Sequence, residues 1–128
     1  MQIHQSAEDY LETILMLSQR MGRVRSIDVV NELGYTKASV SIAMKKLREN
    51  GYIAVDGEGN LTLLEPGREI AERIYSRHRL LTHFFVQLGV DEEVAAEDAC
   101  KAEHILSEQT LEKIREYALL HDAQDSVK

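Results

Sequence analysis

Residues 97–104, Glu-Asp-Ala-Cys-Lys-Ala-Glu-His, carry three different metal-donor side chains within about one helical turn. If the segment is helical, Cys100, Glu103 and His104 stand at positions i, i+3 and i+4 and project from one face. A thiolate, a carboxylate and an imidazole can each donate a lone pair to one divalent ion. Three donors on one helix seldom complete a metal site, so we expect other segments to supply further ligands.

Further donors stand in two other segments, each with an ordinary structural explanation. Asp9 and Glu12 lie three residues apart in a predicted first helix, where acidic residues near the N-terminus also favour the helix dipole. His78 falls between Ile74 and Leu81, close to the apolar face of a long predicted helix. A lone histidine there is more often a hydrogen-bonded core residue than a ligand. The residues alone leave both interpretations open.

Composition is typical of a helical, soluble chain of one domain or of two small domains that share a core. The 128 residues are 44% hydrophobic and 29% charged, with a single proline. No apolar run is long enough to cross a bilayer, and the N-terminus lacks the features of a signal peptide. We therefore expect a cytoplasmic protein without a membrane partner. Cys100 is the single cysteine, so it cannot form an internal disulfide and would remain a thiol.

The charge distribution is uneven. The net charge of −7 argues at first against a nucleic-acid partner, but residues 65–128 carry −6 of it and residues 1–64 only −1. All seven basic residues of the first half fall between Arg20 and Arg48, where two acidic residues oppose them. A local basic patch in an acidic protein can bind phosphates, although it can also be an ordinary solvated surface.

The first half predicts a winged helix-turn-helix. We expect a helix over residues 6–19 with Ser6 as N-cap, and a second over 27–33 that Ser26 caps and Gly34 ends. Thr36 is expected to cap a polar, basic helix that reaches about residue 50. Alternating runs at 52–55 and 61–64 flank a glycine-rich turn and predict a β-hairpin wing.

The second half predicts three helices, over residues 66–88, 92–106 and 108–120, with a polar, fraying tail after His121. The fold class is therefore mainly α: an N-terminal DNA-binding domain at residues 1–65 and an all-α metal-binding and dimerisation domain at 66–128. The first helix would also contribute to the metal site. Helices after Asp91 expose more apolar surface than one small fold hides, so we expect a homodimer, which would present two reading helices to a palindromic site.

The order of winged helix, long helix and Cys-x-x-Glu-His segment resembles the diphtheria toxin repressor family of metal-dependent regulators, which includes iron-dependent repressors and manganese transport regulators. Four segments carry the resemblance, which covers nearly the whole chain: Ala7-Glu-Asp-Tyr-Leu-Glu12, Thr36-Lys-Ala-Ser-Val-Ser41, Tyr75-Ser-Arg-His-Arg-Leu80 and Asp98-Ala-Cys-Lys-Ala-Glu-His104. Each is weak alone, but the four in this order are specific. The chain is expected to be a short form that lacks the additional C-terminal domain of longer members.

The resemblance implies a set of metal ligands, and their types bear on the choice of ion. By position they fall on Asp9, Glu12, His78, Cys100, Glu103 and His104. The set is a hybrid, because Asp9 and Glu12 resemble the manganese type whereas Cys100 resembles the iron type. A thiolate is a softer donor than a carboxylate and favours Fe²⁺ over Mn²⁺. We expect Fe²⁺, with Mn²⁺ next, and one or two ions per subunit.

The expected function is metal-activated repression of metal-homeostasis genes through double-stranded DNA. Phosphate contacts are predicted for Thr36, Lys37, Ser39, Lys45 and Lys46, base contacts for Ala38 and Ser39, and further contacts for Arg25, Ser41 and Asn60. An alternative is a winged-helix regulator that senses a thiol oxidant or an organic ligand through Cys100, although an oxidant sensor needs no companion carboxylates. A metalloenzyme is less consistent with the sequence, because it would leave the DNA-binding half unexplained, so we expect no catalysis.

Overall fold

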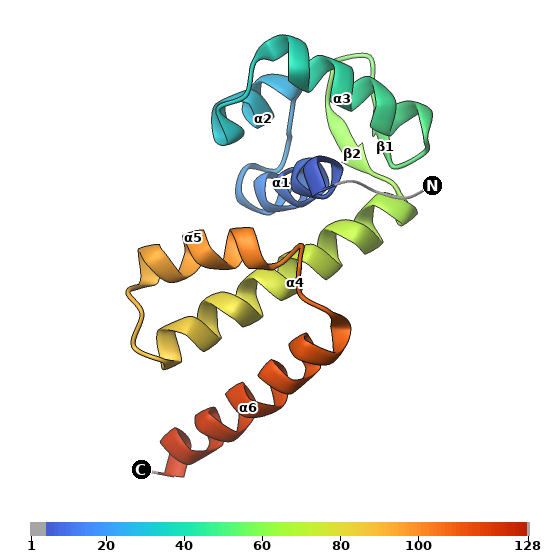
Figure 1. Cartoon of the computed structure of the whole chain (residues 1–128). Helices are drawn as coiled ribbons and strands as arrows, with labels where there is room; N and C mark the ends of the chain where they lie inside the picture. Colours follow the sequence, from blue (N-terminus) through green and yellow to red (C-terminus); the bar gives the residue numbers. More distant parts are fainter. Residues whose placement is uncertain (1–4, 128) are drawn as a thin grey trace. The chain divides into compact units, whose positions relative to one another are not determined.

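The computed structural model describes residues 5–127, and the side chains of residues 6–122. Within that range the chain forms six helices and one two-stranded antiparallel hairpin (Figure 1). It divides into two compact units between Arg73 and Ile74, a point that lies inside helix α4 (Glu65–Gln87). Among the described residues, no helix combines the length and apolarity that crossing a bilayer requires. The predicted fold class is confirmed.

The first unit packs three helices against a short hairpin. Its elements are α1 (Gln5–Met21), α2 (Ser26–Leu33), α3 (Lys37–Glu49), β1 (Ile53–Val55), β2 (Leu61–Leu63) and the beginning of α4. Apolar side chains one helical turn apart form the core, among them Leu11 and Ile14 of α1 and Val40, Met44 and Leu47 of α3. This packing ties α1, α2 and α3 together, so a displacement of α1 would be transmitted to α3.

Local signals place the turn between α2 and α3. Gly34 ends α2 with a φ of 72°, in the left-handed region that glycine adopts readily. Thr36 is the N-cap of α3, and its hydroxyl accepts a hydrogen bond from the Ser39 backbone N–H at 3.1 Å. Both features confirm the predicted helix-turn-helix, whose second helix is α3.

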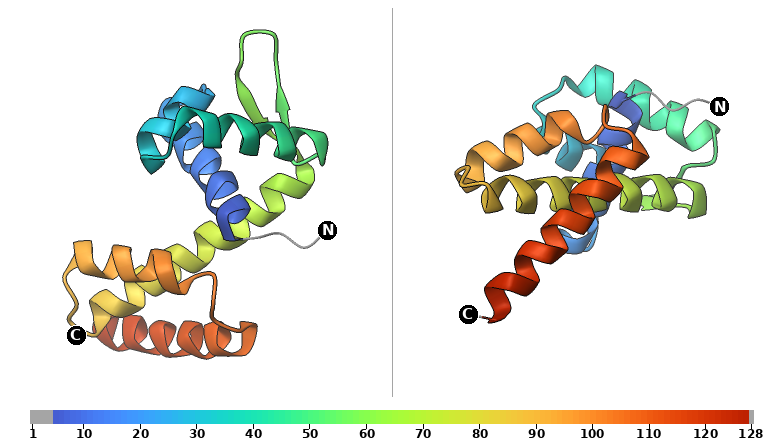
Figure 2. Two further views of the ribbon diagram at one scale, coloured as in Figure 1. Left: turned by 45° about the horizontal axis from the view of Figure 1, so that its top comes forward. Right: turned by 60° about the horizontal axis from the view of Figure 1, so that its bottom comes forward.

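The wing is a hairpin formed by β1 and β2 (Figure 2), and the carboxylate of Asp56 holds its turn. Ile53 pairs with Leu63 and Val55 with Leu61. In the turn, Asp56 accepts hydrogen bonds from the backbone N–H groups of Glu58 and Asn60 and from the Asn60 side-chain amide, at 2.9, 2.9 and 3.0 Å. These bonds lower the pKa of Asp56, the Asn60 side chain being the largest cause.

The second unit consists of the remainder of α4 with α5 (Glu92–Ala102) and α6 (Glu108–Val127). One buried side chain from each helix meets in its core: Leu81, Ala99 and Leu111. Figure 1 shows α5 and α6 running beside the distal part of α4. The core therefore brings the C-terminal end of α5 close to α4.

Four predicted helix boundaries are corrected by the structure. Helix α1 begins at Gln5, so Ser6 lies inside it, and α2 begins at Ser26 because the Asp28 carboxylate accepts the Arg25 N–H at 2.9 Å. Helix α5 ends at Ala102 rather than 106, where its backbone turns toward the next helix. Helix α6 continues to Val127 because no glycine or proline follows His121 to interrupt it.

Candidate metal centre and nucleic-acid surface

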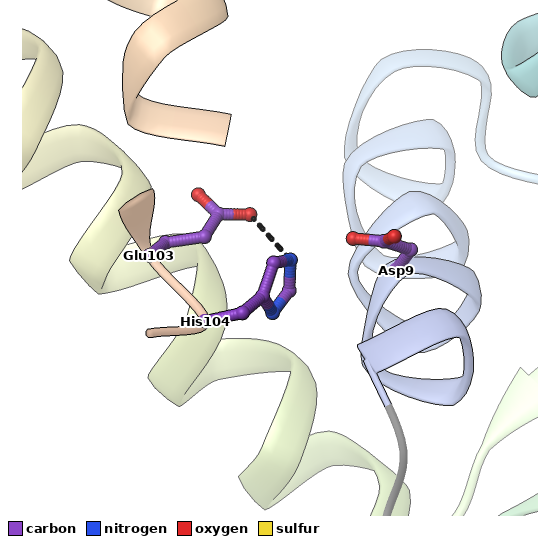
Figure 3. A group of neighbouring side chains, drawn as sticks. All are labelled: Asp9, Glu103 and His104. Carbon is purple, nitrogen blue, oxygen red and sulfur yellow. Dashed lines mark ion pairs between the residues drawn. The ribbon is translucent and has the colours of Figure 1, made fainter. Parts of the chain in front are cut away.

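A buried carboxylate lies between two imidazoles in the second unit. Glu103 is 0% exposed, and its Oε2 lies 3.0 Å from Nδ1 of His78 on α4. Its Oε1 lies 3.4 Å from Nε2 of His104, whose side chain is only 2% exposed (Figure 3). The trio therefore presents one carboxylate and two imidazoles in a region withdrawn from solvent.

The end of α5 determines how this trio is presented. The Glu103 N–H still donates to the Ala99 carbonyl at 2.9 Å, but the Ile105 N–H donates to Ala102, three residues back, at 3.1 Å. The chain thus tightens into a turn that carries His104, which corrects the prediction of one continuous helical face. Arg77 of α4 secures the turn by donating to the Glu103 carbonyl at 3.3 Å and by pairing with Glu108.

The contacts of the Glu103 carboxylate are unusual for a buried acid. Oε2 has His78 as its hydrogen-bond partner, whereas Oε1 accepts no hydrogen bond within the described part of the chain. Arg77 approaches the backbone carbonyl of Glu103, not its carboxylate. Burying a carboxylate is costly unless charges or hydrogen bonds compensate it. A divalent cation fits this arrangement, because imidazole and carboxylate are common ligands of Mn²⁺, Fe²⁺ and Zn²⁺.

Two more of the predicted ligands lie in the first unit, on α1. Asp9 and Glu12 are three residues apart and so share a face of the helix; Glu12 is buried and Asp9 half-buried. Figure 3 also draws the Asp9 side chain on α1.

An aromatic contact anchors α1 to the turn between α2 and α3. Tyr10, which lies between Asp9 and Glu12 in the sequence, packs edge-on against Tyr35 with ring centroids 5.8 Å apart. Burial raises the pKa of Tyr10, and Tyr35 and Asp9 add to the increase.

Cys100, the remaining predicted ligand, differs from the others in its surroundings. It lies on α5 one turn before Glu103, and its side chain is exposed. The structure thus brings His78, Glu103 and His104 together inside one unit and leaves the thiol accessible to solvent. The sequence spacing did not distinguish these environments, because the helix ends between Cys100 and Glu103.

The predicted DNA-contacting residues lie on the first unit. Those of α3 are all exposed: Lys37, Ala38, Ser39, Ser41, Lys45 and Lys46. A hollow of about 270 Å³ lies beside α3, and its lining consists of Ser26, Ser41, Met44, Lys45, Arg48 and Val55. Ser26 and Arg48 were not predicted, although Arg48 follows Lys45 by three residues on the same flank. Two hydroxyls and two cations make this hollow suitable for a phosphate.

The two predicted DNA-contacting residues at the wing, Arg25 and Asn60, also contact each other and the turn of the hairpin. Arg25 is exposed and pairs with Asn60 through an isolated β-bridge, and its guanidinium lies against Gly59. The Asn60 amide donates to Asp56 within the turn. Arg25 therefore runs along the wing, while Asn60 helps to shape it.

A winged helix-turn-helix with a basic second helix, followed by a helical unit with a buried histidine–carboxylate cluster, defines a class: DNA-binding regulators that respond to a metal ion. Comparisons with known proteins agree. Residues 2–61 match the family model described as the iron dependent repressor, N-terminal DNA binding domain. Residues 64–120 match the model of the iron dependent repressor, metal binding and dimerisation domain. The chain belongs to the iron-dependent repressor family, whose members are metal-dependent, DNA-binding transcriptional repressors, and the predicted resemblance and function are confirmed.

Individual relatives are similar to this chain over most of their own length. The HTH-type transcriptional regulator MntR of Bacillus subtilis is 32% identical over 123 residues, which cover 96% of this chain and 87% of that protein. An HTH-type transcriptional regulator of Methanocaldococcus jannaschii is 36% identical over 113 residues, covering 87% of this chain and 90% of the relative.

Among solved structures, a manganese-dependent transcriptional repressor in complex with manganese superposes with a TM-score of 0.79 at 29% identity. The match covers 88% of this chain and 52% of that one, so the chain spans about half of the length of this structure. The manganese regulator SloR gives a TM-score of 0.76 at 25% identity, with 91% of this chain and 54% of the other covered.

Proposed function

We propose that this repressor is activated when a divalent ion, Fe²⁺ in preference to Mn²⁺, binds donors from both units, with one or two ions per subunit. The proposed ligands are Asp9, Glu12, His78, Cys100, Glu103 and His104. The observation that carries the proposal is the buried Glu103 carboxylate between His78 and His104, with one oxygen that accepts no hydrogen bond within the described part of the chain. The donor set of carboxylates, imidazoles and a thiol fits the ions from Mn²⁺ to Zn²⁺.

The exposed thiol is the group on which the choice of ion depends. The oxygen and nitrogen donors suit Mn²⁺ as well as Fe²⁺, whereas the softer Cys100 thiolate favours Fe²⁺. Mn²⁺ is the second candidate, because the chain is similar to relatives named MntR and to a repressor with bound manganese. Both imidazoles and the thiol must be deprotonated when they ligate, so protons compete with the ion.

In the proposed mechanism, the carboxylates of α1 and of Glu103 repel one another when their charge is not compensated. A bound ion supplies the compensating positive charge. Tyr10 packs against Tyr35 and buried side chains of α1 join the core of α2 and α3, so a fixed α1 holds the recognition helix in place. Ion binding would then raise the protein's affinity for DNA. DNA binding would raise its affinity for the ion by the same factor, typically about 5- to 150-fold.

The proposal extends to the assembly. Residues 1–65 would bind DNA and residues 66–128 would bind metal and form a homodimer in the cytoplasm. Several large apolar side chains of the second unit support a dimer because they are exposed: Leu88, Val94, Ile105, Tyr117, Leu119 and Leu120. A twofold dimer would present two copies of α3 to a palindromic operator that controls metal-homeostasis genes.

The decisive experiment measures operator affinity during titration with Fe²⁺ under anaerobic conditions and, separately, with Mn²⁺. The operator is selected from random duplexes with the metal-loaded protein, and binding is followed by fluorescence anisotropy. We expect an increase in affinity of about 5- to 150-fold that a chelator reverses. Equal affinity with and without either ion would refute the proposal.

One observation favours a second candidate, a sensor of thiol oxidants, because Cys100 is exposed and so accessible to peroxide. The Cys100→Ser variant separates the two functions. If the thiol serves metal activation, this variant should lose its preference for Fe²⁺ over Mn²⁺, and peroxide should affect operator binding by neither the variant nor the unmodified protein. An oxidant sensor predicts that it loses a peroxide response while both metal responses persist.

A further inference from the structure

The recognition helix presents a large apolar side chain to solvent. Ile42 of α3 is 58% exposed, more than any other large apolar side chain described in the first unit. An exposed isoleucine at a random surface position needs no explanation. Ile42, however, lies on α3, the second helix of the helix-turn-helix, where an exposed apolar side chain faces outward among cations and hydroxyls.

The helical geometry directs Ile42 away from the protein core. The buried stripe of α3 consists of Val40, Met44 and Leu47. Ile42 follows Val40 by two residues and therefore lies about 200° around the helix from it. Ala38 is one turn earlier on the same side and is also exposed. The outward face of α3 thus has an apolar stripe formed by Ala38 and Ile42.

The surroundings of this stripe indicate which kind of surface would cover it. The helix carries four basic residues, Lys37, Lys45, Lys46 and Arg48, and its single acidic residue, Glu49, is at the end. Exposed serines, Ser39 and Ser41, lie within the same turns. The cations and hydroxyls would bind the anionic groups of a partner, and the apolar stripe would contact apolar groups that lie between them. The major groove of DNA is such a surface, with phosphates at its edges and thymine methyl groups on its floor.

We propose that the Ile42 side chain, with Ala38 beside it, contacts thymine C5-methyl groups in the major groove and specifies thymine at those operator positions. The inference rests on the proposed function, because it requires binding to a specific duplex. Each methyl group withdrawn from water contributes about as much as one buried methylene, so losing one should weaken binding by about fourfold.

The test replaces thymines of the selected operator one at a time with deoxyuridine, which removes the methyl group and leaves base pairing unchanged. Affinities are measured with Mn²⁺-loaded protein. We expect the unmodified protein to lose about fourfold affinity at one or more positions. The Ile42→Ala variant should bind the unmodified operator more weakly and should lose its sensitivity to deoxyuridine at one of those positions.

Ile27→Ala is the matched control, because Ile27 is an exposed isoleucine (43%) on α2, outside the outward face of α3. This variant should keep the full deoxyuridine pattern, and circular dichroism should show that both variants melt like the unmodified protein. The inference is overturned if deoxyuridine has no effect at any position, or if Ile42→Ala is as sensitive as the unmodified protein at every position. Metal-dependent operator binding in those cases would leave the proposed function standing, whereas failure to select any operator would refute both.

Discussion

Replacing Glu103 with glutamine tests the metal centre with the smallest change in shape. The amide occupies nearly the same volume as the carboxylate and can still accept a hydrogen bond from His78, whose Nδ1 lies 3.0 Å from Oε2. The variant removes the negative charge between His78 and His104 and replaces one carboxylate oxygen with an NH2 group. A structural role of Glu103 would survive this change largely intact, whereas a role as an anionic metal ligand would not.

The metal-free protein should be little affected. A hydrogen bond to a charged acceptor contributes about 1 kcal/mol more than one to a neutral acceptor, and this loss is opposed by relief of the cost of burying the carboxylate. Because Glu103 is 0% exposed, that relief is substantial. We therefore expect the free energy of unfolding without metal to change by less than about 2 kcal/mol in either direction.

The metal-loaded protein should lose most of its additional stability. An ion at 100 times its Kd stabilises the folded state by about 2.7 kcal/mol. Changes in groups that only support a metal ligand weaken affinity about 10- to 100-fold, so loss of a ligand should cost at least about 100-fold. At the same ion concentration the stabilisation then falls to about 0.4 kcal/mol. For a chain of this size the difference corresponds to about 9 °C in Tm.

The assay is thermal melting followed by circular dichroism, with and without Mn²⁺ at 100 times the Kd of the unmodified protein. Glu112→Gln is the matched control, because Glu112 is exposed on α6 and pairs with Arg115 at 2.6 Å. It should retain the full metal-induced increase in Tm. A Glu103→Gln variant that also retains the increase would show that this carboxylate is not a ligand. A loss of more than about 3 kcal/mol without metal would show that the metal-free fold itself requires the negative charge of Glu103.

Two further predictions concern the first unit. Gly67→Ala should lower the free energy of unfolding by about 1–3 kcal/mol in urea denaturation, because the added Cβ would overlap the backbone carbonyl oxygen of Tyr52. Gly57→Ala is the control, since its Cβ meets open space, and an equal effect of both changes would contradict the packing argument. Hydrogen bonds from Asn60 hold the pKa of Asp56 below its ordinary value of 3.8. The hydrogen-bonded carboxylate therefore contributes fully to the stability of the folded state above that pH, and its contribution is lost as the pH falls through the folded-state pKa. Carboxyl NMR titration should find this low midpoint, and Asn60→Ala should raise it; an unchanged midpoint would exclude Asn60 as the cause.

Features that depend on neighbouring residues were predictable from the sequence. Thr36 as N-cap and Gly34 after α2 follow from short-range hydrogen bonding and backbone conformation, so the helix-turn-helix could be located before the structure. The alternating apolar runs of the hairpin likewise needed only the side-chain period of a strand. The order of these elements, with the donor residues at their spacings, was enough to indicate the family.

The environment of each donor was decided by tertiary structure. Sequence spacing put Cys100, Glu103 and His104 on one helical face, but α5 ends at Ala102, and the turn secured by Arg77 buries Glu103 while Cys100 remains exposed. Packing between helices distant in the chain gives Glu103 its contact with His78, and the same kind of packing leaves Ile42 facing outward from α3. Burial depends on contacts between segments far apart in the chain, and no local pattern of residue types contains that information.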